Sequence, residues 1–202
     1  MKEYYYDKLL NIKTGEEQQG FHKSFHYHRY EPTPYAALEE LFKHYVLNST
    51  DRVVDFGCGK GRLNFYLHHY FHTHVLGIEM DETFYRDAME NRNSYLRKTK
   101  NQQDKVQFCC CLAEEYEIHP QDNRFYFFNP FSVQVFRRII NNILLSVEKI
   151  EREVDLILYY PSEDYIYFLE NHTAFNLVLE VQVPYVYQHN QNERFLIYRF
   201  PS

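Results

Sequence analysis

An acid followed by three closely spaced glycines is the strongest chemical signal in this chain. A short apolar run ends in Asp55, and Gly57, Gly59 and Gly61 follow at once. Glycine is needed where the backbone takes a positive φ or lies against a ligand with no Cβ between them. A helix-compatible stretch comes next, so we predict a buried strand, a tight turn and a helix. This arrangement indicates a site for a nucleotide-like cofactor.

The spacing of the glycines distinguishes between kinds of nucleotide-binding turn. A dinucleotide fold needs G-x-G-x-x-G, but Arg62 holds the place of the third glycine. A phosphate loop needs G-K-[ST], and Lys60 is followed by Gly61 instead. The remaining pattern, Asp-x-Gly-x-Gly-x-Gly, resembles motif I of class I S-adenosylmethionine-dependent methyltransferases. The resemblance implies that S-adenosylmethionine is the cofactor and that it lies against Asp55, Phe56, Gly57, Cys58, Gly59 and Gly61.

A second acid stands where a ribose ligand is expected. Residues 74–81 predict the next strand, which ends in Glu79, roughly 20 residues past the glycine turn. By the same resemblance, Glu79 binds the ribose hydroxyls of the cofactor, with Met80 beside it. The alternative is that Glu79 caps the following helix, for which Asp81 is the better candidate.

Two further strand ends complete the expected site. Many members of the family carry an acid for the adenine amino group after the third strand, where this chain has Leu112. Glu114 comes two residues late, so we expect the backbone of Leu112 and Ala113 to contact the base. After the fourth strand, Asn129-Pro-Phe131 resembles motif IV of amino-group methyltransferases, which usually has two prolines. The resemblance implies that Asn129 is catalytic and accepts a hydrogen bond from the acceptor amino group. The alternative is a strand-ending turn in which Pro130 starts a helix.

The segment before the glycine turn carries two more candidates. Residues 30–35, YEPTPY, resemble a stretch upstream of motif I in a loosely defined bacterial group, where it folds over the methionine end of the cofactor. This implies that Tyr30 and Thr33 contact the cofactor carboxylate or close over it, helped by a helix N-terminus. The alternative is that Thr33 only caps that helix. We expect residues 1–29 to form an N-terminal arm or lid, and residues 30–202 to form the S-adenosylmethionine-binding domain.

Strands and helices alternate along the chain, which is typical of a parallel α/β sheet. Apolar residues at helical spacing predict a first helix at residues 36–45. We expect strands at 52–56, 74–78, 106–111, 124–128 and 154–159, and helices at 62–69, 81–96, 133–147 and within 164–172. Residues 175–183 and 193–200 read as an antiparallel pair joined by a hairpin-like link. The family resemblance then implies a Rossmann-like three-layer sandwich with a mostly parallel seven-stranded sheet, order 3-2-1-4-5-7-6, and a C-terminal antiparallel hairpin.

Composition limits the compartment and the metal chemistry. The 202 residues suit one domain with one core, and the 45% hydrophobic content suits a globular protein. Nothing approaches a span of ~18 apolar residues, and the N-terminus lacks the apolar core of a signal peptide, so we expect a cytoplasmic protein with no membrane partner. Cys58 and the consecutive Cys109, Cys110 and Cys111 are expected to be buried thiols, because adjacent strand residues point to opposite faces and cannot converge on a metal. His22, His26 and His28 lack partners at zinc-ligand spacing. We therefore expect no metal.

Charge is the main evidence from the sequence about the methyl acceptor. The net charge is −6, with no dense Lys/Arg block, whereas a nucleic-acid groove needs several phosphate contacts. We therefore expect a nitrogen on a small molecule or protein, ahead of a nucleic acid. An amino group of RNA or DNA, and a non-catalytic S-adenosylmethionine sensor, are the alternatives. No general base is identified, and the sequence does not indicate an oligomeric state.

Overall fold

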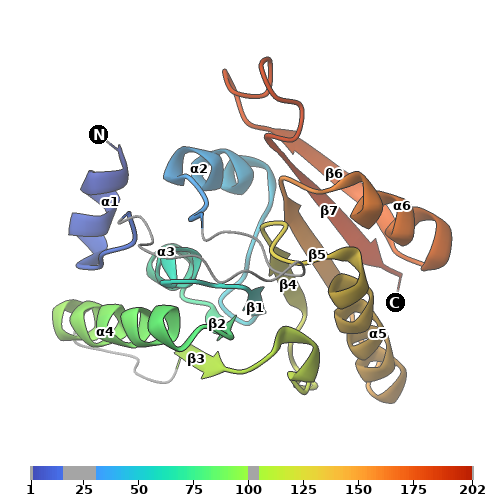
Figure 1. Cartoon of the computed structure of the whole chain (residues 1–202), viewed down its shortest axis with the longest axis horizontal. Helices are drawn as coiled ribbons and strands as arrows, with labels where there is room; N and C mark the ends of the chain where they lie inside the picture. Colours follow the sequence, from blue (N-terminus) through green and yellow to red (C-terminus); the bar gives the residue numbers. More distant parts are fainter. Residues whose placement is uncertain (1, 16–30, 100–104, 202) are drawn as a thin grey trace.

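A central seven-stranded sheet organises the chain (Figure 1). The computed structural model describes residues 2–15, 31–99 and 105–201. The strand order is β3-β2-β1-β4-β5-β7-β6. The strands are β1 Arg52–Phe56, β2 His74–Glu79, β3 Val106–Cys110, β4 Arg124–Phe127, β5 Val154–Tyr159, β6 Asn176–Gln182 and β7 Arg194–Phe200. The first five strands run parallel, and β7 pairs antiparallel with β5 and β6, which confirms the predicted order and the C-terminal hairpin.

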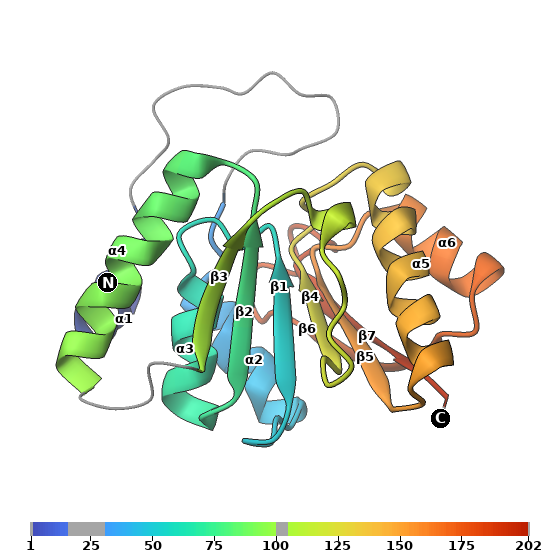
Figure 2. The ribbon, with the colours of Figure 1, turned by 90° about the horizontal axis from the view of Figure 1, so that it is seen from below.

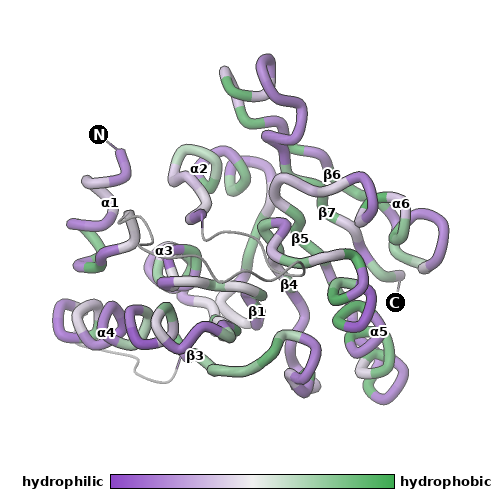
Figure 3. Tube along the Cα trace, in the orientation of Figure 1, coloured by the Kyte–Doolittle hydropathy of each residue, from purple (hydrophilic) through white to green (hydrophobic). Residues whose placement is uncertain are grey.

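Helices cover both faces of the sheet, giving three layers (Figure 2). One face carries α1 Lys2–Leu10, α2 Tyr35–His44, α3 Arg62–Phe71 and α4 Glu82–Thr99; the other carries α5 Val133–Lys149, α6 Glu163–His172 and the short 3-10 turn η1 Ala113–Glu115. Successive side chains of a strand point to opposite faces, so Val53 packs with the first set and Val54 with the second. Along α5, hydrophobic and hydrophilic residues alternate, as expected of a helix with one buried stripe (Figure 3).

The described N-terminal residues pack on the body of the domain. Residues 2–10 form the helix α1, which was not expected, and the ring of Tyr6 stacks on Tyr35 of α2 at 4.5 Å between centroids. The Arg62 guanidinium forms an ion pair with Glu3, and its Nε donates to Thr14 Oγ1 at 2.7 Å. The division of the chain at residue 29 stays a prediction, because residues 16–30 lie outside the described residues.

The cysteine run lies on the outermost strand, β3, and is less buried than expected. Cys110 is exposed, whereas Cys109 and Cys111 are half-buried with 3.5 Å between their sulfurs. An edge strand is covered by only one neighbour, so burial was correctly expected only for Cys58. His22, His26 and His28 lie outside the described residues. Within the described ranges, no three His, Cys, Asp or Glu side chains gather into a group that could hold a metal ion. None of the helices described is long and apolar enough to span a bilayer.

Candidate active site

The glycine turn at the carboxyl end of β1 needs glycine for both conformation and space. Gly57, Gly59 and Gly61 have φ values of 80°, 53° and 83°, in the region that disfavours other residues. A Cβ on Gly57 would lie 2.8 Å from the Cβ of Pro130, and one on Gly61 would lie 2.6 Å from the ring of Phe108. The turn is therefore in direct contact with the segment that follows β4.

Phe56 and Cys58, the two non-glycine residues between Asp55 and Gly59, have buried side chains. The ring of Phe56 is fully buried on the α5 face, with its centroid 5.1 Å from that of Phe127. Cys58 is buried, and its backbone N–H donates to the carbonyl oxygen of Ile78 at 3.0 Å. Any contact of Phe56 or Cys58 with a cofactor must therefore come from the backbone. Strand β2 holds this backbone in place through the carbonyl oxygen of Ile78.

Asp55 is a buried acid at the end of β1. Asp55 is only 4% exposed and lies two residues before the first glycine of the turn. With the amide of Asn64 oriented to satisfy both its polar atoms, Nδ2 donates to Asp55 Oδ2 at 3.0 Å and Oδ1 accepts from Gly77 N at 3.1 Å. Burial, with the charge of Glu79 adding to it, raises the pKa of Asp55 to about 8. A cation bound nearby would favour the charged form and lower that pKa.

Glu79 lies against the glycine turn from the end of β2. Its Oε2 accepts from the backbone N–H of Gly59 at 2.9 Å, and its Oε1 accepts from that of Asp81 at 2.9 Å. Burial raises the pKa of Glu79, while these hydrogen bonds act in the opposite direction. Asp81 Oδ1 accepts from Thr83 N at 2.8 Å, so Asp81 caps α4, as expected. Glu79 is thus held at the turn, and the half-exposed Met80 lies beside it.

The end of β3 presents no acid to an adenine. Leu112 is 37% exposed at the start of η1, and Ala113 is buried. The carboxylate of Glu114 pairs with Arg138 of α5, Nη1 to Oε1 3.6 Å, so Glu114 is directed towards that helix. The contact of Leu112 and Ala113 with the base stays a prediction.

Asn129 is held next to the glycine turn in an unusual backbone conformation. Its φ is 40°, which a residue other than glycine rarely adopts. The following residue, Pro130, is the one that Gly57 contacts, and Phe131 is fixed by the Tyr165 hydroxyl, which donates to the Phe131 carbonyl oxygen at 2.6 Å. Helix α5 begins only at Val133, so Pro130 is not its first residue and the helix-start alternative is wrong.

The segment before α2 departs from expectation. Thr33 is buried, and its Oγ1 lies 2.7 Å from the hydroxyl oxygen of Tyr126 on β4. Pro34 is the N-cap of α2 and no side chain caps it, so the prediction that Thr33 caps this helix is wrong. The Thr33 hydroxyl is engaged in the core, and its contact with the cofactor stays a prediction. Tyr30 lies outside the described residues.

Sequence reasoning missed two residues of the site, Asn64 and Arg62, both on the buried face of α3. Asn64 links Asp55 to Gly77 of β2. Arg62 follows the last glycine of the turn and also donates to the Thr33 carbonyl oxygen at 3.3 Å. The sequence did contain a sign of their role. Both are polar residues at buried positions of the predicted helix, and buried polar groups need hydrogen-bond partners.

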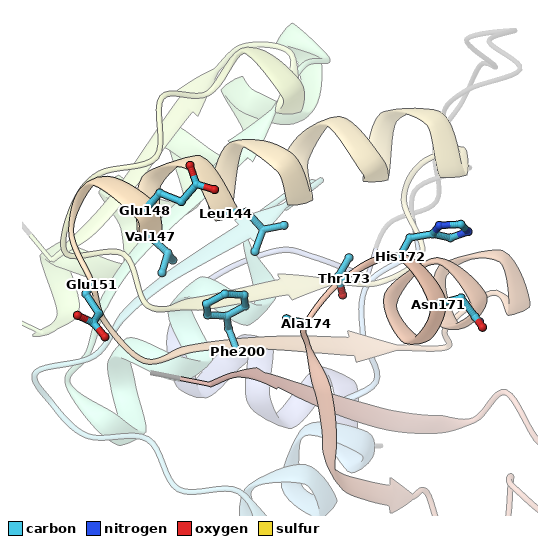
Figure 4. Close-up of a pocket in the computed structure, with 9 residues that line it drawn as sticks. All are labelled: Leu144, Val147, Glu148, Glu151, Asn171, His172, Thr173, Ala174 and Phe200. Atoms are coloured by element: carbon cyan, nitrogen blue, oxygen red, sulfur yellow. The ribbon is translucent and has the colours of Figure 1, made fainter.

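A pocket of about 760 Å³ lies away from these residues, between the carboxyl ends of α5 and α6 and the end of β7 (Figure 4). Leu144, Val147 and Phe200 form its apolar wall, and Glu148 and Glu151 lie at its border. None of the predicted site residues lines it, so we assign it no part in the site.

A comparison with known families identifies the class of this fold and site. A sequence model described as a methyltransferase domain matches residues 47–159, more than half of the chain. The chain therefore belongs to this methyltransferase domain family. No curated protein gives a significant sequence match.

Solved structures share the fold at low sequence identity. A putative RNA methyltransferase from Pyrococcus horikoshii is 21% identical with a TM-score of 0.59, and the match covers 100% of this chain and 99% of that one. An RNA methyltransferase from Salinibacter ruber, in complex with S-adenosyl-L-homocysteine, is 16% identical with a TM-score of 0.59, covering 84% of this chain and 92% of that one. TrmK from M. capricolum, also in complex with S-adenosylhomocysteine, is 10% identical with a TM-score of 0.50, covering 84% and 68%. The predicted family, fold and cofactor are confirmed: this is a Rossmann-like class I methyltransferase domain, and its cofactor is S-adenosylmethionine.

The expectation about the acceptor is contradicted. A small molecule or protein was expected ahead of a nucleic acid, but the similar structures include RNA methyltransferases. The physical reason for the error is that net charge averages over the whole chain, whereas phosphate contacts depend on where the cations gather.

Proposed function

We propose that this protein transfers the methyl group of S-adenosylmethionine to a nitrogen of RNA, at a site between the Gly57 turn and Asn129. One observation carries the proposal: Pro130 lies so close to Gly57 that a Cβ there would be 2.8 Å from the proline Cβ. The loop that resembles an amino-group methyltransferase motif therefore lies beside the loop that resembles the cofactor motif. The RNA methyltransferases among the similar structures support RNA as the acceptor class.

The residues of the site fit S-adenosylmethionine chemically. Glu79 supplies carboxylate oxygens at the strand end where a ribose diol is bound in such sheets. The glycines leave the backbone open to a ligand, and Asp55 offers a buried acid that a cationic group would stabilise in its charged form. When bound, the cofactor supplies an already activated sulfonium methyl, so transfer needs positioning more than proton transfer.

The acceptor side of the site is aromatic and conformationally strained. Tyr160 directly follows β5 and has a φ of 52°, and β5 pairs with β4, which Asn129 follows by two residues. The rings of Phe128 and Tyr160 are half-buried with their centroids 6.4 Å apart, and Asn190 donates to the Tyr160 hydroxyl at 2.8 Å. Strained residues gather at functional sites, and half-buried rings suit the stacking of an unpaired base. Asn129 would hold the nitrogen by accepting one of its hydrogens, which leaves the lone pair directed at the methyl group.

The test is methyl transfer from labelled S-adenosylmethionine to separate RNA, peptide and metabolite pools. We expect label in RNA that ribonuclease releases, and a loss of at least about a hundredfold in Asn129→Gly, the size typical of one lost transition-state contact. Glycine keeps the left-handed backbone at this position, so the variant tests the amide alone. The matched control is Asn192→Gly, which removes an exposed amide from the β6–β7 turn. Label only in peptides or metabolites would refute the RNA acceptor, and binding of the cofactor with no transfer to any pool would favour the sensor alternative.

A further inference from the structure

A set of basic side chains gathers at the end of the sheet opposite the glycine turn. We call this set the basic edge; it comprises Lys8, His69, His72, His74, Arg97, Lys98 and Lys105. The side chains come from the carboxyl ends of α1, α3 and α4 and from the starts of β2 and β3. Lys98 Nζ donates to the carbonyl oxygen of Leu9 at 2.8 Å, and Lys105 Nζ donates to that of His72 at 2.9 Å. These bonds join the contributing elements into one surface.

The cations of the basic edge have no carboxylate partner among the described residues. Lys98 and Lys105 bond to carbonyl oxygens, and Arg97 Nη2 donates to Ser94 Oγ at 3.1 Å. Elsewhere, by contrast, buried cations pair with acids, as Arg62 does with Glu3. An ammonium has three donors, so each lysine still has donors for a ligand after bonding to the carbonyls.

The histidines show the sign of the local field. Burial lowers the pKa of His69, and the charges of His72 and Lys98 lower it further. Burial likewise lowers the pKa of His74, with further contributions from Lys105 and Arg52. Every charged group that shifts these two histidines is basic. A bound anion would act in the opposite direction and would raise both pKa values.

The placement of the basic edge suits a long ligand. Strand β2 runs from His74, in the basic edge, to Glu79, at the glycine turn, and the five steps between them at ~3.3 Å each separate the two by about 16 Å. Figure 2 shows the carboxyl ends of α3 and α4 at the opposite end of the sheet from the start of α4. An RNA whose reactive base lies at Asn129 could reach the basic edge only with nucleotides well beyond that base.

We propose that the basic edge is a docking surface for the phosphodiester backbone of the RNA substrate, remote from the methyl-transfer site. This rests on the proposed function and adds to it a second contact region. Basic side chains from five elements, with no carboxylate partner among the described residues, are what a phosphate backbone requires, because each neutralised phosphate releases a counterion. The surface would set affinity and salt dependence, and the Asn129 side would set which atom is methylated.

The test compares Lys98→Gln/Lys105→Gln with the wild type and with the control Lys43→Gln/Lys149→Gln, whose lysines lie on other elements. The probe is an unmodified RNA hairpin made by transcription, and its binding is followed by fluorescence anisotropy over a range of salt concentrations. We expect the slope of log K against log salt to fall by about 1.4 to 1.8 in the first variant, at ~0.7 per contact with single-stranded and ~0.9 with double-stranded phosphates, and to be unchanged in the control. Wild-type binding should also tighten as the pH is lowered from about 8 to about 5, because a bound phosphate raises the lowered pKa values of His69 and His74 and so favours their charged forms. Circular dichroism checks that each variant is folded.

The methylation readout separates this inference from the proposed function. The Lys98→Gln/Lys105→Gln variant should lose methyl transfer to the hairpin at limiting RNA, but not to a single nucleotide, which has no phosphate that could lie at the basic edge while its base lies at Asn129. An unchanged salt slope with normal RNA methylation would overturn the docking surface and leave the proposed function intact. RNA binding through the basic edge without any RNA methylation would overturn the proposed function instead. Loss of binding to anionic phosphatidylglycerol vesicles, with RNA binding unaffected, would mean that the surface meets a membrane and not RNA.

Discussion

The substitution Asp55→Asn should stabilise the empty protein at neutral pH while it weakens cofactor binding. Asp55 has an unfolded-state pKa near 3.8 and a folded-state pKa of about 8, so between these values the folded protein holds a proton that the unfolded chain has lost. Stability must then be greatest below the lower value and fall as the pH rises towards 8, by up to about 1.4 kcal/mol per pH unit. The amide imitates the protonated carboxyl and does not titrate. We expect a gain of at least about 2 kcal/mol at pH ~8, less than the full shift because a buried site relaxes around a charge.

Urea unfolding of the wild type and of Asp55→Asn, repeated from pH ~5 to pH ~9, tests this directly. The two unfolding free energies should diverge as the pH rises, with the variant the more stable. Calorimetry with S-adenosylmethionine should show at least about tenfold weaker binding to the variant, since the buried acid that balances the ligand's positive charge is gone. Wild-type binding should release protons below pH ~8, detectable as a dependence of the binding heat on the buffer. Parallel pH profiles for the two proteins would show that the pKa of Asp55 is not raised and would refute this reasoning.

Substitutions at three further positions test separate parts of the site. Glu79→Gln should weaken binding of S-adenosylmethionine by about tenfold in calorimetry, because one ribose acceptor becomes a donor, while the exposed control Glu82→Gln should not. Asn129→Ala and Asn129→Gly should lose kcat alike, but only the alanine variant should also lose about 1 kcal/mol of stability in urea, since its backbone has a φ of 40°. Arg62→Met should cost about 2 kcal/mol of stability in the same urea assay, because it removes hydrogen bonds made by a buried charged donor. Glu3→Gln should cost less, because the Glu3 side chain is 46% exposed. Equal losses would contradict the conclusion that burial of Arg62 makes its hydrogen bonds important.

The sheet could be predicted because its elements are encoded locally. Apolar runs at period two and apolar stripes at helical spacing gave each strand and most helices within a few residues of their observed ends. The order of the strands came from the family resemblance and not from periodicity. Helix α1 was missed because only Leu10 supplies a buried aliphatic side chain there, and the rest of its packing uses Tyr6, Glu3 and Asp7. Such contacts leave no hydrophobic stripe in the sequence.

In the site, too, features close together in the sequence could be predicted, and contacts between distant residues could not. The positive-φ turn from Gly57 to Gly61 is contiguous in sequence, and Glu79, predicted from its strand end, is 20 residues from the Gly59 N–H that it accepts from. The bond between Thr33 and Tyr126 joins residues 93 positions apart, and that between Arg62 and Thr14 joins residues 48 apart. No spacing rule in one sequence relates such pairs. Thr33 does not cap α2, because its hydroxyl bonds to a partner from β4 instead.

The mistaken preference against nucleic acid follows from counting every charge as if it faced the solvent. Asp51, Asp55, Glu79, Asp122 and Asp155 are buried, and the raised pKa of Asp55 means that it is partly uncharged at neutral pH. Among the residues that the structure describes, three cations are buried as well, so the net charge of −6 assigns more negative charge to this part of the surface than the fold places there. A ligand responds to the local potential, and the two buried acids nearest the start of β2 are each paired with a cation: Asp51 with Arg124, and Asp122 with Arg52. The net charge of this chain therefore does not predict its acceptor. The salt dependence of RNA binding is the better measurement, because it reports the phosphate contacts of the local surface.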